Sequence, residues 1–248
     1  MGHHISKDGI KPPPNRVDAL MNYPPPRHIK QNRRILGMFN WFKRYIPNYS
    51  IVVEPLTRLL LKNVKFQWST EQEQAFVKLK NVLQNSEVLA FSRFDLPFYL
   101  AVDSSAQGIG YVLYQKHLEN SDEKVRIIRF GSKALTSWQK SYGPTKLELL
   151  VTSIVENSRY LRGNKFILEC DHQALCPLFQ NKFKGAIYDR WLAVLQQYNF
   201  EIRYKPASQM QVADALSRYP ETRFVDNRAD DSPDEKRPIF FIYGRSSG

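Results

Sequence analysis

Apolar and polar residues follow one another in two different ways along the 248-residue chain. Up to residue 87 the apolar positions recur at intervals of three and four residues, which is typical of helices with one buried face. This spacing predicts helices near residues 15–21, 30–46, 51–62 and 70–84. The last of these begins at Ser69-Thr70-Glu71, a helix-start signal. Residues 1–87 are therefore expected to form a small, mainly helical module.

From residue 88 to residue 218 short alternating apolar runs come first and helical patterns follow, which predicts an α/β domain. Strands are expected near residues 97–103, 109–116, 125–131, 165–170 and 200–205. Helices are expected near residues 144–160, 173–180 and 187–198, with a last one from about 209. The predicted fold is a mixed five-stranded sheet with flanking helices.

The remaining residues, 219–248, have a different composition. Residues 226–236 are charged and rich in turn formers, which is typical of a disordered tail or linker. Within this tail, residues 239–243 form a short apolar run with the composition of a strand.

The charge of the chain points to a polyanionic partner. There are 36 Lys and Arg against 24 Asp and Glu, a net charge of +12, and the pI is about 9.6. Residues 1–87 hold 14 of the basic residues and only 6 acidic ones. Within them aromatic and basic residues interleave, and Trp41, Lys43 and Arg44 are the candidates for contact with nucleic acid; the plainer interpretation is a solvated basic face with some rings in the core.

Cysteine content and hydropathy indicate the cellular compartment in which the chain is expected. Two cysteines are too few for a disulfide framework or a zinc cluster, which fits a reducing compartment, so the chain is expected in the cytoplasm or nucleus. No run of about 18 apolar residues occurs, so no membrane span or membrane partner is expected.

Four acidic residues stand in distinctive local sequences: Asp103, Glu148, Asp171 and Asp214. Asp103 and Asp171 stand at the ends of predicted strands, and Glu148 and Asp214 lie in predicted helices. Each has an ordinary explanation when taken singly, as a turn former, a helix-dipole partner or a cap. Taken together, strand ends and helices of this order can converge on one edge of a sheet.

Carboxylates that gather at one place repel each other, so such a site needs a cation. Hard oxygen ligands select Mg²⁺ or Mn²⁺, and two such ions about 3.5–4 Å apart are a common device for in-line attack on a phosphodiester. The four carboxylates therefore define a candidate two-metal site.

Over residues 2 to about 220 the chain resembles the end of the Pol polyprotein of gypsy-type LTR retrotransposons. The ribonuclease H motifs of that family match in order at Val102-Asp103-Ser104-Ser105, Gly108 to Gln115, Tyr142 to Leu150, Cys170 to Leu175, and Val212-Ala213-Asp214-Ala215-Leu216-Ser217-Arg218. Earlier segments resemble the thumb side of the family's reverse transcriptase: Gly2 to Ile10, Leu36 to Pro47, and Pro55 to Leu60. The Tyr-x-Asp-Asp strand of the polymerase palm is absent, so this chain alone is not expected to polymerise DNA.

The resemblance implies a thumb-like segment over residues 1–87 and a ribonuclease H domain over residues 88–218. It implies hydrolysis of the RNA strand of RNA–DNA hybrids with two Mg²⁺ or Mn²⁺ ions. In the family pattern Asp103 bridges both ions, Asp171 and Glu148 complete the site near the leaving 3′ oxygen, and Asp214 helps to hold the ion that activates water. The expected partners are the hybrid and either a polymerase subunit or the rest of a Pol polyprotein.

One departure from the family pattern bears on activity. The family usually has Gly-Lys-x-Asn before Val-Ala-Asp, whereas this chain has Ala207-Ser208-Gln209-Met210-Gln211, so a methionine stands at the Asn position. All four carboxylates are nevertheless intact. The alternative to an active nuclease is a catalytically weak or inactive retroelement fragment that binds nucleic acid or serves as a scaffold.

Overall fold

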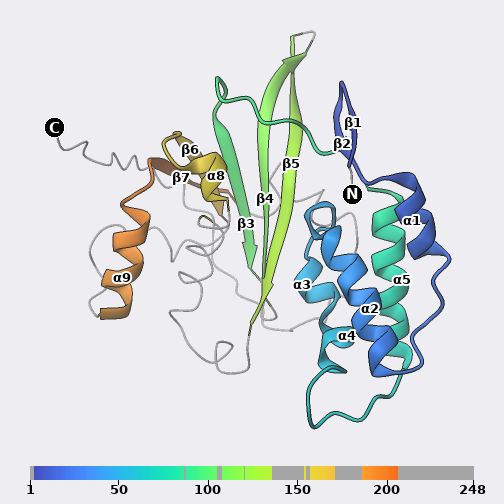
Figure 1. Ribbon diagram of the computed structural model, residues 1–248. Helices are drawn as coiled ribbons and strands as arrows, with labels where there is room; N and C mark the ends of the chain where they lie inside the picture. Colours follow the sequence, from blue (N-terminus) through green and yellow to red (C-terminus); the bar gives the residue numbers. More distant parts are fainter. Residues whose placement is uncertain are drawn as a thin grey trace, which may run out of the picture.

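A computed structural model describes residues 3–86, 88–104, 108–119, 121–135, 154, 157–170 and 186–205. Figure 1 shows the first helices grouped at one side of a twisted sheet and the later helices at the other. The structure confirms the predicted α/β fold, with a mixed five-stranded sheet and flanking helices.

The N-terminal module contains a small hairpin and several short helices. Its elements are β1 (His4–Ser6), β2 (Gly9–Lys11), α1 (Pro14–Met21), α2 (Ile29–Trp41), the 3₁₀ helix η1 (Lys43–Tyr45), α3 (Tyr49–Val52), α4 (Glu54–Arg58) and α5 (Thr70–Gln84). The apolar spacing seen in the sequence explains their packing, since Ile35, Leu36 and Phe39 of α2 are buried while its basic residues point outward.

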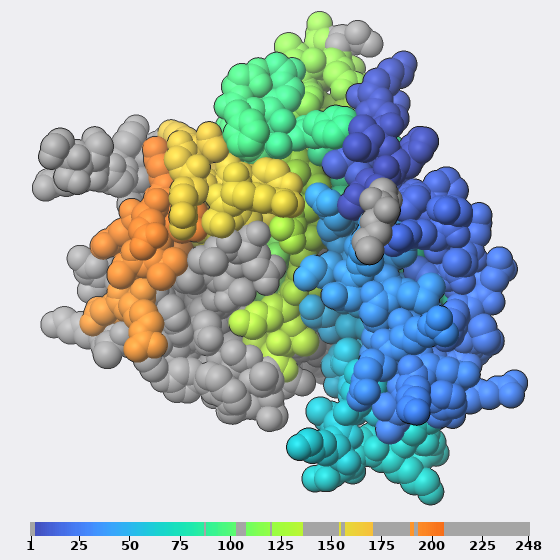
Figure 2. Space-filling model, viewed as in Figure 1, coloured from blue at the N-terminus to red at the C-terminus, as the bar shows by residue number. Residues whose placement is uncertain are grey.

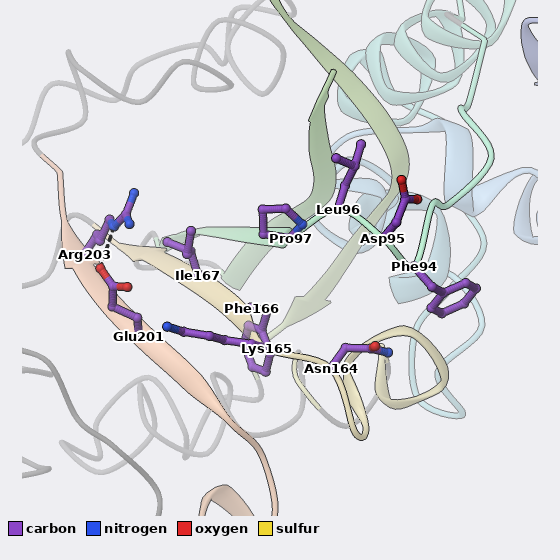
Figure 3. Close-up of a pocket in the computed structure, with 10 residues that line it drawn as sticks. All are labelled: Phe94, Asp95, Leu96, Pro97, Asn164, Lys165, Phe166, Ile167, Glu201 and Arg203. Atoms are coloured by element: carbon purple, nitrogen blue, oxygen red, sulfur yellow. Dashed lines mark hydrogen bonds and ion pairs between the residues drawn. The ribbon is translucent and has the colours of Figure 1, made fainter. Parts of the chain in front are cut away.

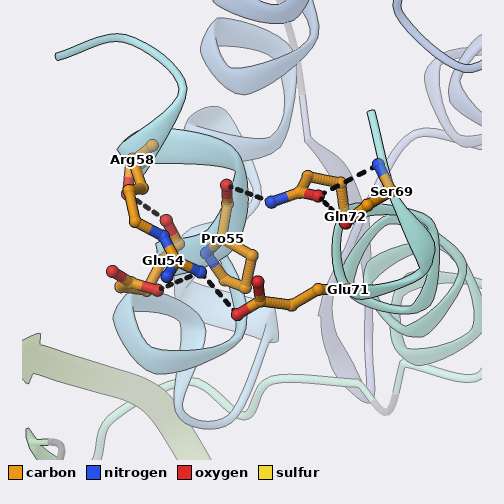
Figure 4. Close-up of polar contacts among 7 residues, drawn as sticks. Glu54, Pro55, Arg58, Ser69, Glu71 and Gln72 are labelled. Carbon is orange, nitrogen blue, oxygen red and sulfur yellow. Dashed lines mark hydrogen bonds and ion pairs between the residues drawn. The ribbon is translucent and has the colours of Figure 1, made fainter. Parts of the chain in front are cut away.

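Polar contacts join these helices at their ends (Figure 4). The backbone N–H of Ser69 donates to Gln72 Oε1 at 3.1 Å, and Gln72 Nε2 donates to the carbonyl of Pro55 at 3.3 Å. Arg58 of α4 bridges to Glu71 of α5 at 2.5 Å. One capping residue thus starts α5 and also ties it to α4.

The sheet is built from β3 (Phe98–Ser104), β4 (Gly108–Glu119), β5 (Asp122–Ala134), β6 (Phe166–Cys170) and β7 (Phe200–Tyr204). Its strand order is β5-β4-β3-β6-β7. The first three strands form an antiparallel meander, and β6 and β7 extend it in parallel with β3. The described helices of this part are α8 (Ser158–Leu161) and α9 (Ala186–Leu195).

The two faces of the sheet bury different partners. Phe98, Leu100 and Leu168 pack with Leu161 and Leu195 from α8 and α9. The opposite face packs into the same hydrophobic cluster as the N-terminal helices, through Tyr99, Ala101, Val112, Tyr114, Ile127, Phe130 and Ile167. Figure 2 shows the blue helices and the lime strand β5 meeting in a continuous surface. The N-terminal module and the sheet therefore share one core.

The segment that joins the two parts, residues 88–97, is held along its length. Leu89 exchanges backbone hydrogen bonds with Ile10, and the N–H of Ala90 donates to Ile127. Gln115, which is fully buried, accepts from the N–H of Arg93 and donates to the carbonyls of Arg93 and Leu96. Gln115 thus anchors this connection to β4.

In the N-terminal module two of the expected helices differ from the structure. The helix expected over residues 30–46 ends at Trp41 and is followed by the 3₁₀ turn η1. The helix expected over 51–62 is two short helices, because Pro55 has no N–H for a continuing helix and instead lies in the first turn of α4. None of the described helices is long and apolar enough to cross a membrane.

Candidate functional site

Asp103 lies near the carboxyl end of β3, as the sequence predicts. Its Cα is paired with Gly110 of β4, and Gly110 is paired with Ser132 of β5. These three residues form one transverse row of the sheet, close to the place where β3 and β5 end and β4 begins. The side chain of Asp103 lies outside the described part of the structure.

Strand β6 approaches the same edge of the sheet. It runs parallel to β3, and its last residue, Cys170, is paired with Val102. Asp171 is the next residue of the chain, but it lies outside the described residues, as do Glu148 and Asp214. In the described residues no three His, Cys, Asp or Glu side chains are grouped as around a metal ion.

A buried carboxylate that sequence reasoning missed lies two residues before Asp171. Glu169 is only 1% exposed, and it accepts a hydrogen bond of 2.7 Å from the hydroxyl of Tyr114. Its other oxygen lies 2.6 Å from Lys205 Nζ. Burial, and then the neighbouring Glu169, raise the pKa of Tyr114, so its hydroxyl stays protonated as a donor. The one available signal was an acidic residue inside the apolar run Phe166-Ile167-Leu168-Glu169-Cys170.

The predicted nucleic-acid residues lie at the end of α2 and in η1. Lys43 is exposed and Arg44 is partly exposed, whereas Trp41 is partly buried. The ring of Trp41 stacks on His3 with centroids 4.6 Å apart, and the Arg16 guanidinium carbon lies 5.0 Å from its centre. Burial and the cationic neighbours Arg44 and Arg16 lower the pKa of His3. The basic side chains are thus open to a partner, while the tryptophan already has stacking partners within the chain.

A pocket of about 360 Å³ lies elsewhere on the sheet (Figure 3). It is bordered by residues just before β3 and at the start of β6, so it lies at the opposite ends of these strands from Asp103. Its lining residues are Phe94, Asp95, Leu96, Pro97, Asn164, Lys165, Phe166, Ile167, Glu201 and Arg203. The pocket is therefore separate from the candidate carboxylate site.

Sequence comparisons identify relatives over most of the chain. Residues 68–168 match the family described as the RNase H-like domain found in reverse transcriptase. The chain is 36% identical to the Retrovirus-related Pol polyprotein from transposon opus of Drosophila melanogaster, over 89% of its own length and 23% of the relative's. It is 35% identical to the polyprotein from transposon 297 of the same fly, over 88% of the chain and 20% of the relative. A Transposon Tf2-3 polyprotein of Schizosaccharomyces pombe is 32% identical, over 88% of the chain and 17% of the relative. The chain thus spans about a fifth of the length of these relatives.

Solved structures agree on the fold. The foamy viral protease-reverse transcriptase in complex with an RNA/DNA hybrid has a TM-score of 0.67 and 20% identity, and the match covers 96% of this chain and 31% of that one. The same viral protein in complex with double-stranded DNA has a TM-score of 0.68 and 18% identity, and the match covers 83% of this chain and 44% of that one. At these identities the likeness establishes the architecture.

Proposed function

Because the chain belongs to the Pol polyproteins of gypsy-type retrotransposons and carries their ribonuclease H-like domain, we propose that it hydrolyses the RNA strand of RNA–DNA hybrids. Asp103, Glu148, Asp171 and Asp214 are the proposed catalytic residues. The foamy viral neighbour bound to an RNA/DNA hybrid supports the choice of substrate.

The pairing of β3 with β6 is the observation that carries this proposal. Val102 and Cys170 are Cα partners on parallel strands, and Asp103 and Asp171 are the residues that follow them. Since parallel strands run in the same direction, both lead toward the same edge of the sheet. Carboxyl ends of strands at one edge are also where open α/β sheets commonly bind their ligands.

The donor set fits divalent cations. Four carboxylates supply hard oxygen ligands, which suit Mg²⁺ or Mn²⁺. In such a site two ions would supply Lewis-acid stabilisation for in-line attack at a phosphodiester. The protein's own task is to hold its carboxylates in a fixed arrangement, and the row through Asp103 would fix the first of them.

The direct test is cleavage of a hybrid with a labelled RNA strand in the presence of Mg²⁺ or Mn²⁺. We expect cleavage by the unaltered chain and its loss in Asp103→Asn and in Asp171→Asn, because an amide cannot supply the negative charge that holds the ions. Asp95→Asn is the matched control, since Asp95 is exposed and paired with Arg93 in the connecting segment. Cleavage that persists in both site variants would refute the proposed site.

We further propose that the basic residues after α2 contact the phosphate backbone of the hybrid. Changing Lys43 and Arg44 to Ala should weaken binding, and it should reduce the salt dependence of the affinity by about one unit for each phosphate that is no longer neutralised. The matched control is Lys62→Ala with Lys65→Ala, which removes two exposed charges from the loop between α4 and α5. Equal salt slopes in the two double variants would contradict a localised contact.

The second candidate function, a catalytically weak or inactive fragment that binds nucleic acid or serves as a scaffold, is favoured by Met210. A thioether cannot replace the donor and acceptor groups of the family's Asn, so Asp214 would be less firmly held. On this hypothesis cleavage is low, prefers Mn²⁺, and rises when Met210→Asn restores the family residue. If Met210→Asn leaves Mg²⁺-dependent cleavage unchanged while Asp214→Asn abolishes it, the methionine is not the reason for low activity.

A further inference from the structure

The row of residues that contains Asp103 is contacted from the N-terminal module. Ser132, at the β5 end of this row, accepts a hydrogen bond of 2.7 Å at its hydroxyl from the backbone N–H of Ser50. The hydroxyl of Ser50 in turn donates to the carbonyl of Ser132 at 2.8 Å. Figure 1 shows α3, which contains Ser50, beside the arrowheads of β3 and β5. Two reciprocal bonds thus join the module to one end of the row.

The middle of the row is contacted by Asn48. A β-carbon at Gly110 would overlap the side-chain oxygen of Asn48, so only glycine permits this approach. Asn48 is 9% exposed and has φ of 50°, in the left-handed region that Asn and Gly tolerate best. Its backbone therefore turns the side chain toward the sheet just before α3 begins. Gly108 also lies near α3, since an added β-carbon would lie 3.1 Å from Ile51 Cγ1, although the carbonyl oxygen of Lys133 on β5 would be nearer, at 2.5 Å.

This contact falls where the sheet is expected to be least stable. The row lies one residue from the end of β3 and two residues from each of the adjoining ends of β4 and β5. Strand ends open locally at lower free energy than strand centres. A carboxylate that takes part in metal chemistry must nevertheless be held to about 0.5 Å.

We propose that the turn formed by Asn48, Tyr49 and Ser50 positions the strand that carries Asp103, so that cleavage depends on the N-terminal module. Asn48 and Ser50 are positioning residues: they act on Asp103 through Gly110 and Ser132 rather than on the substrate. The inference rests on the proposed nuclease function for its catalytic consequence, but its structural part can be measured without activity.

The structural part is tested by hydrogen–deuterium exchange of the full chain. Asn48→Gly removes the side chain and keeps a residue that tolerates the left-handed backbone. We expect the amides of residues 101–104 and 109–112 to exchange roughly fivefold faster or more, while those of β6 and β7 change little. Unchanged exchange in these two segments would overturn the proposal whether or not the chain cleaves hybrid, whereas failure of the proposed function would leave this result intact.

The catalytic part is tested by a variant pair. Gly110→Ala forces the new methyl group against Asn48. It should lower the single-turnover cleavage rate about tenfold or more, while the Kd for the hybrid stays within about twofold of that of the unaltered chain. Gly37→Ala is the matched control, because a β-carbon at Gly37 meets nothing within 4 Å. Asn48→Gly should make the added methyl harmless, so that the double variant cleaves as well as Asn48→Gly alone. Additive losses, or a loss that appears in Kd rather than in the cleavage rate, would contradict a positioning role.

The serine pair gives an independent measurement if Gly110→Ala does not fold. Ser50→Ala and Ser132→Ala each remove one of the two reciprocal bonds, and each is expected to lower cleavage about two- to fivefold and to speed exchange at residues 101–104. In the variant that carries both changes, the fold-loss of cleavage should be no larger than the product of the two single losses. Loss of cleavage without faster exchange in this segment would refute the proposal.

Discussion

One face of the sheet is stabilised differently in its two halves. Over β3, β4 and β5 this face carries Tyr99, Val112 and Phe130, and it is buried in the core shared with the N-terminal helices. On β6 and β7 the same face carries Glu169, paired with Lys205, and Glu201, paired with Arg203 at 2.7 Å. Apolar packing depends little on pH and only weakly on moderate concentrations of a neutral salt, whereas ion pairs of this kind depend on both partners being present and charged. The half formed by β3, β4 and β5 therefore holds the N-terminal module in place. The stability of the half formed by β6 and β7 depends on the charge state of its side chains.

The largest effect is expected in the apolar half. Phe130→Ala removes a side chain that is 6% exposed and should lower the free energy of unfolding by about 3–5 kcal/mol, because it leaves a cavity in the shared core. Urea denaturation at low and high salt measures this loss, which should be the same at both. Phe94→Ala, at a ring that is 62% exposed, is the control and should cost under about 1 kcal/mol. Equal losses in the two variants would show that the shared core is loosely packed.

The next effect concerns the charged half. Lys205→Met leaves the buried Glu169 carboxylate without its cation and should cost about 2–3 kcal/mol, less than a fully buried pair because Lys205 is 24% exposed. Adding Glu169→Gln should recover most of this loss, since the buried charge is then gone. A double-mutant cycle by urea denaturation measures the coupling. Additive losses would mean that the two residues do not interact.

A smaller effect is expected at alkaline pH. The pKa of Tyr114 is raised in the folded protein, mainly by burial. The stability that Tyr114 contributes is therefore complete below the pKa of about 10 that tyrosine has in the unfolded chain, and it is lost as the pH rises above that value. The free energy of unfolding should fall between about pH 9.5 and 11.5, and less steeply in Tyr114→Phe. The pKa of Tyr49, in the apolar half, is also raised by burial, so Tyr49→Phe is the matched comparison. An identical slope in all three proteins would contradict the burial of these hydroxyl groups.

The smallest effect is expected at mildly acid pH. The pKa of His117 on β4 is lowered, first by burial and then by Arg93 and Arg126. The stability that it contributes is present above the ordinary value of 6.5 and is lost as pH falls below it. His117→Gln should flatten the fall in unfolding free energy between about pH 7 and 5. An unchanged slope in His117→Gln would contradict this contribution.

Regular periodicity explains what the sequence could predict. The helix α5 occupies residues 70–84 as expected, because its start signal and its apolar stripe agree. The five strands also lie within a few residues of their expected places. Resemblance to a family pointed to Asp103, Glu148, Asp171 and Asp214 as the site. This stays a prediction, because only Asp103 has a backbone position in the described structure.

Contacts between distant residues explain what the sequence could not predict. The β1–β2 hairpin is held to Leu89 by backbone bonds, which no local pattern encodes. Ser50 and Ser132 are 82 residues apart, and short polar side chains are equally common on open surfaces. The acid at Glu169 likewise resembles an ordinary strand residue until the fold brings Tyr114 and Lys205 to it.

The segment that connects the two parts, residues 88–97, affects where proteases can cleave the protein. An extended segment between modules is usually where proteases enter, because its backbone can be drawn into an active-site cleft. Here Leu89 and Ala90 are bonded to other strands, and Gln115 holds the backbone of Arg93 and Leu96 from beneath. Brief digestion should therefore spare residues 89–96 despite the exposed rings of Phe91 and Phe94. Gln115→Ala should make this segment a preferred site of cleavage, releasing the helical module from the sheet under denaturing conditions.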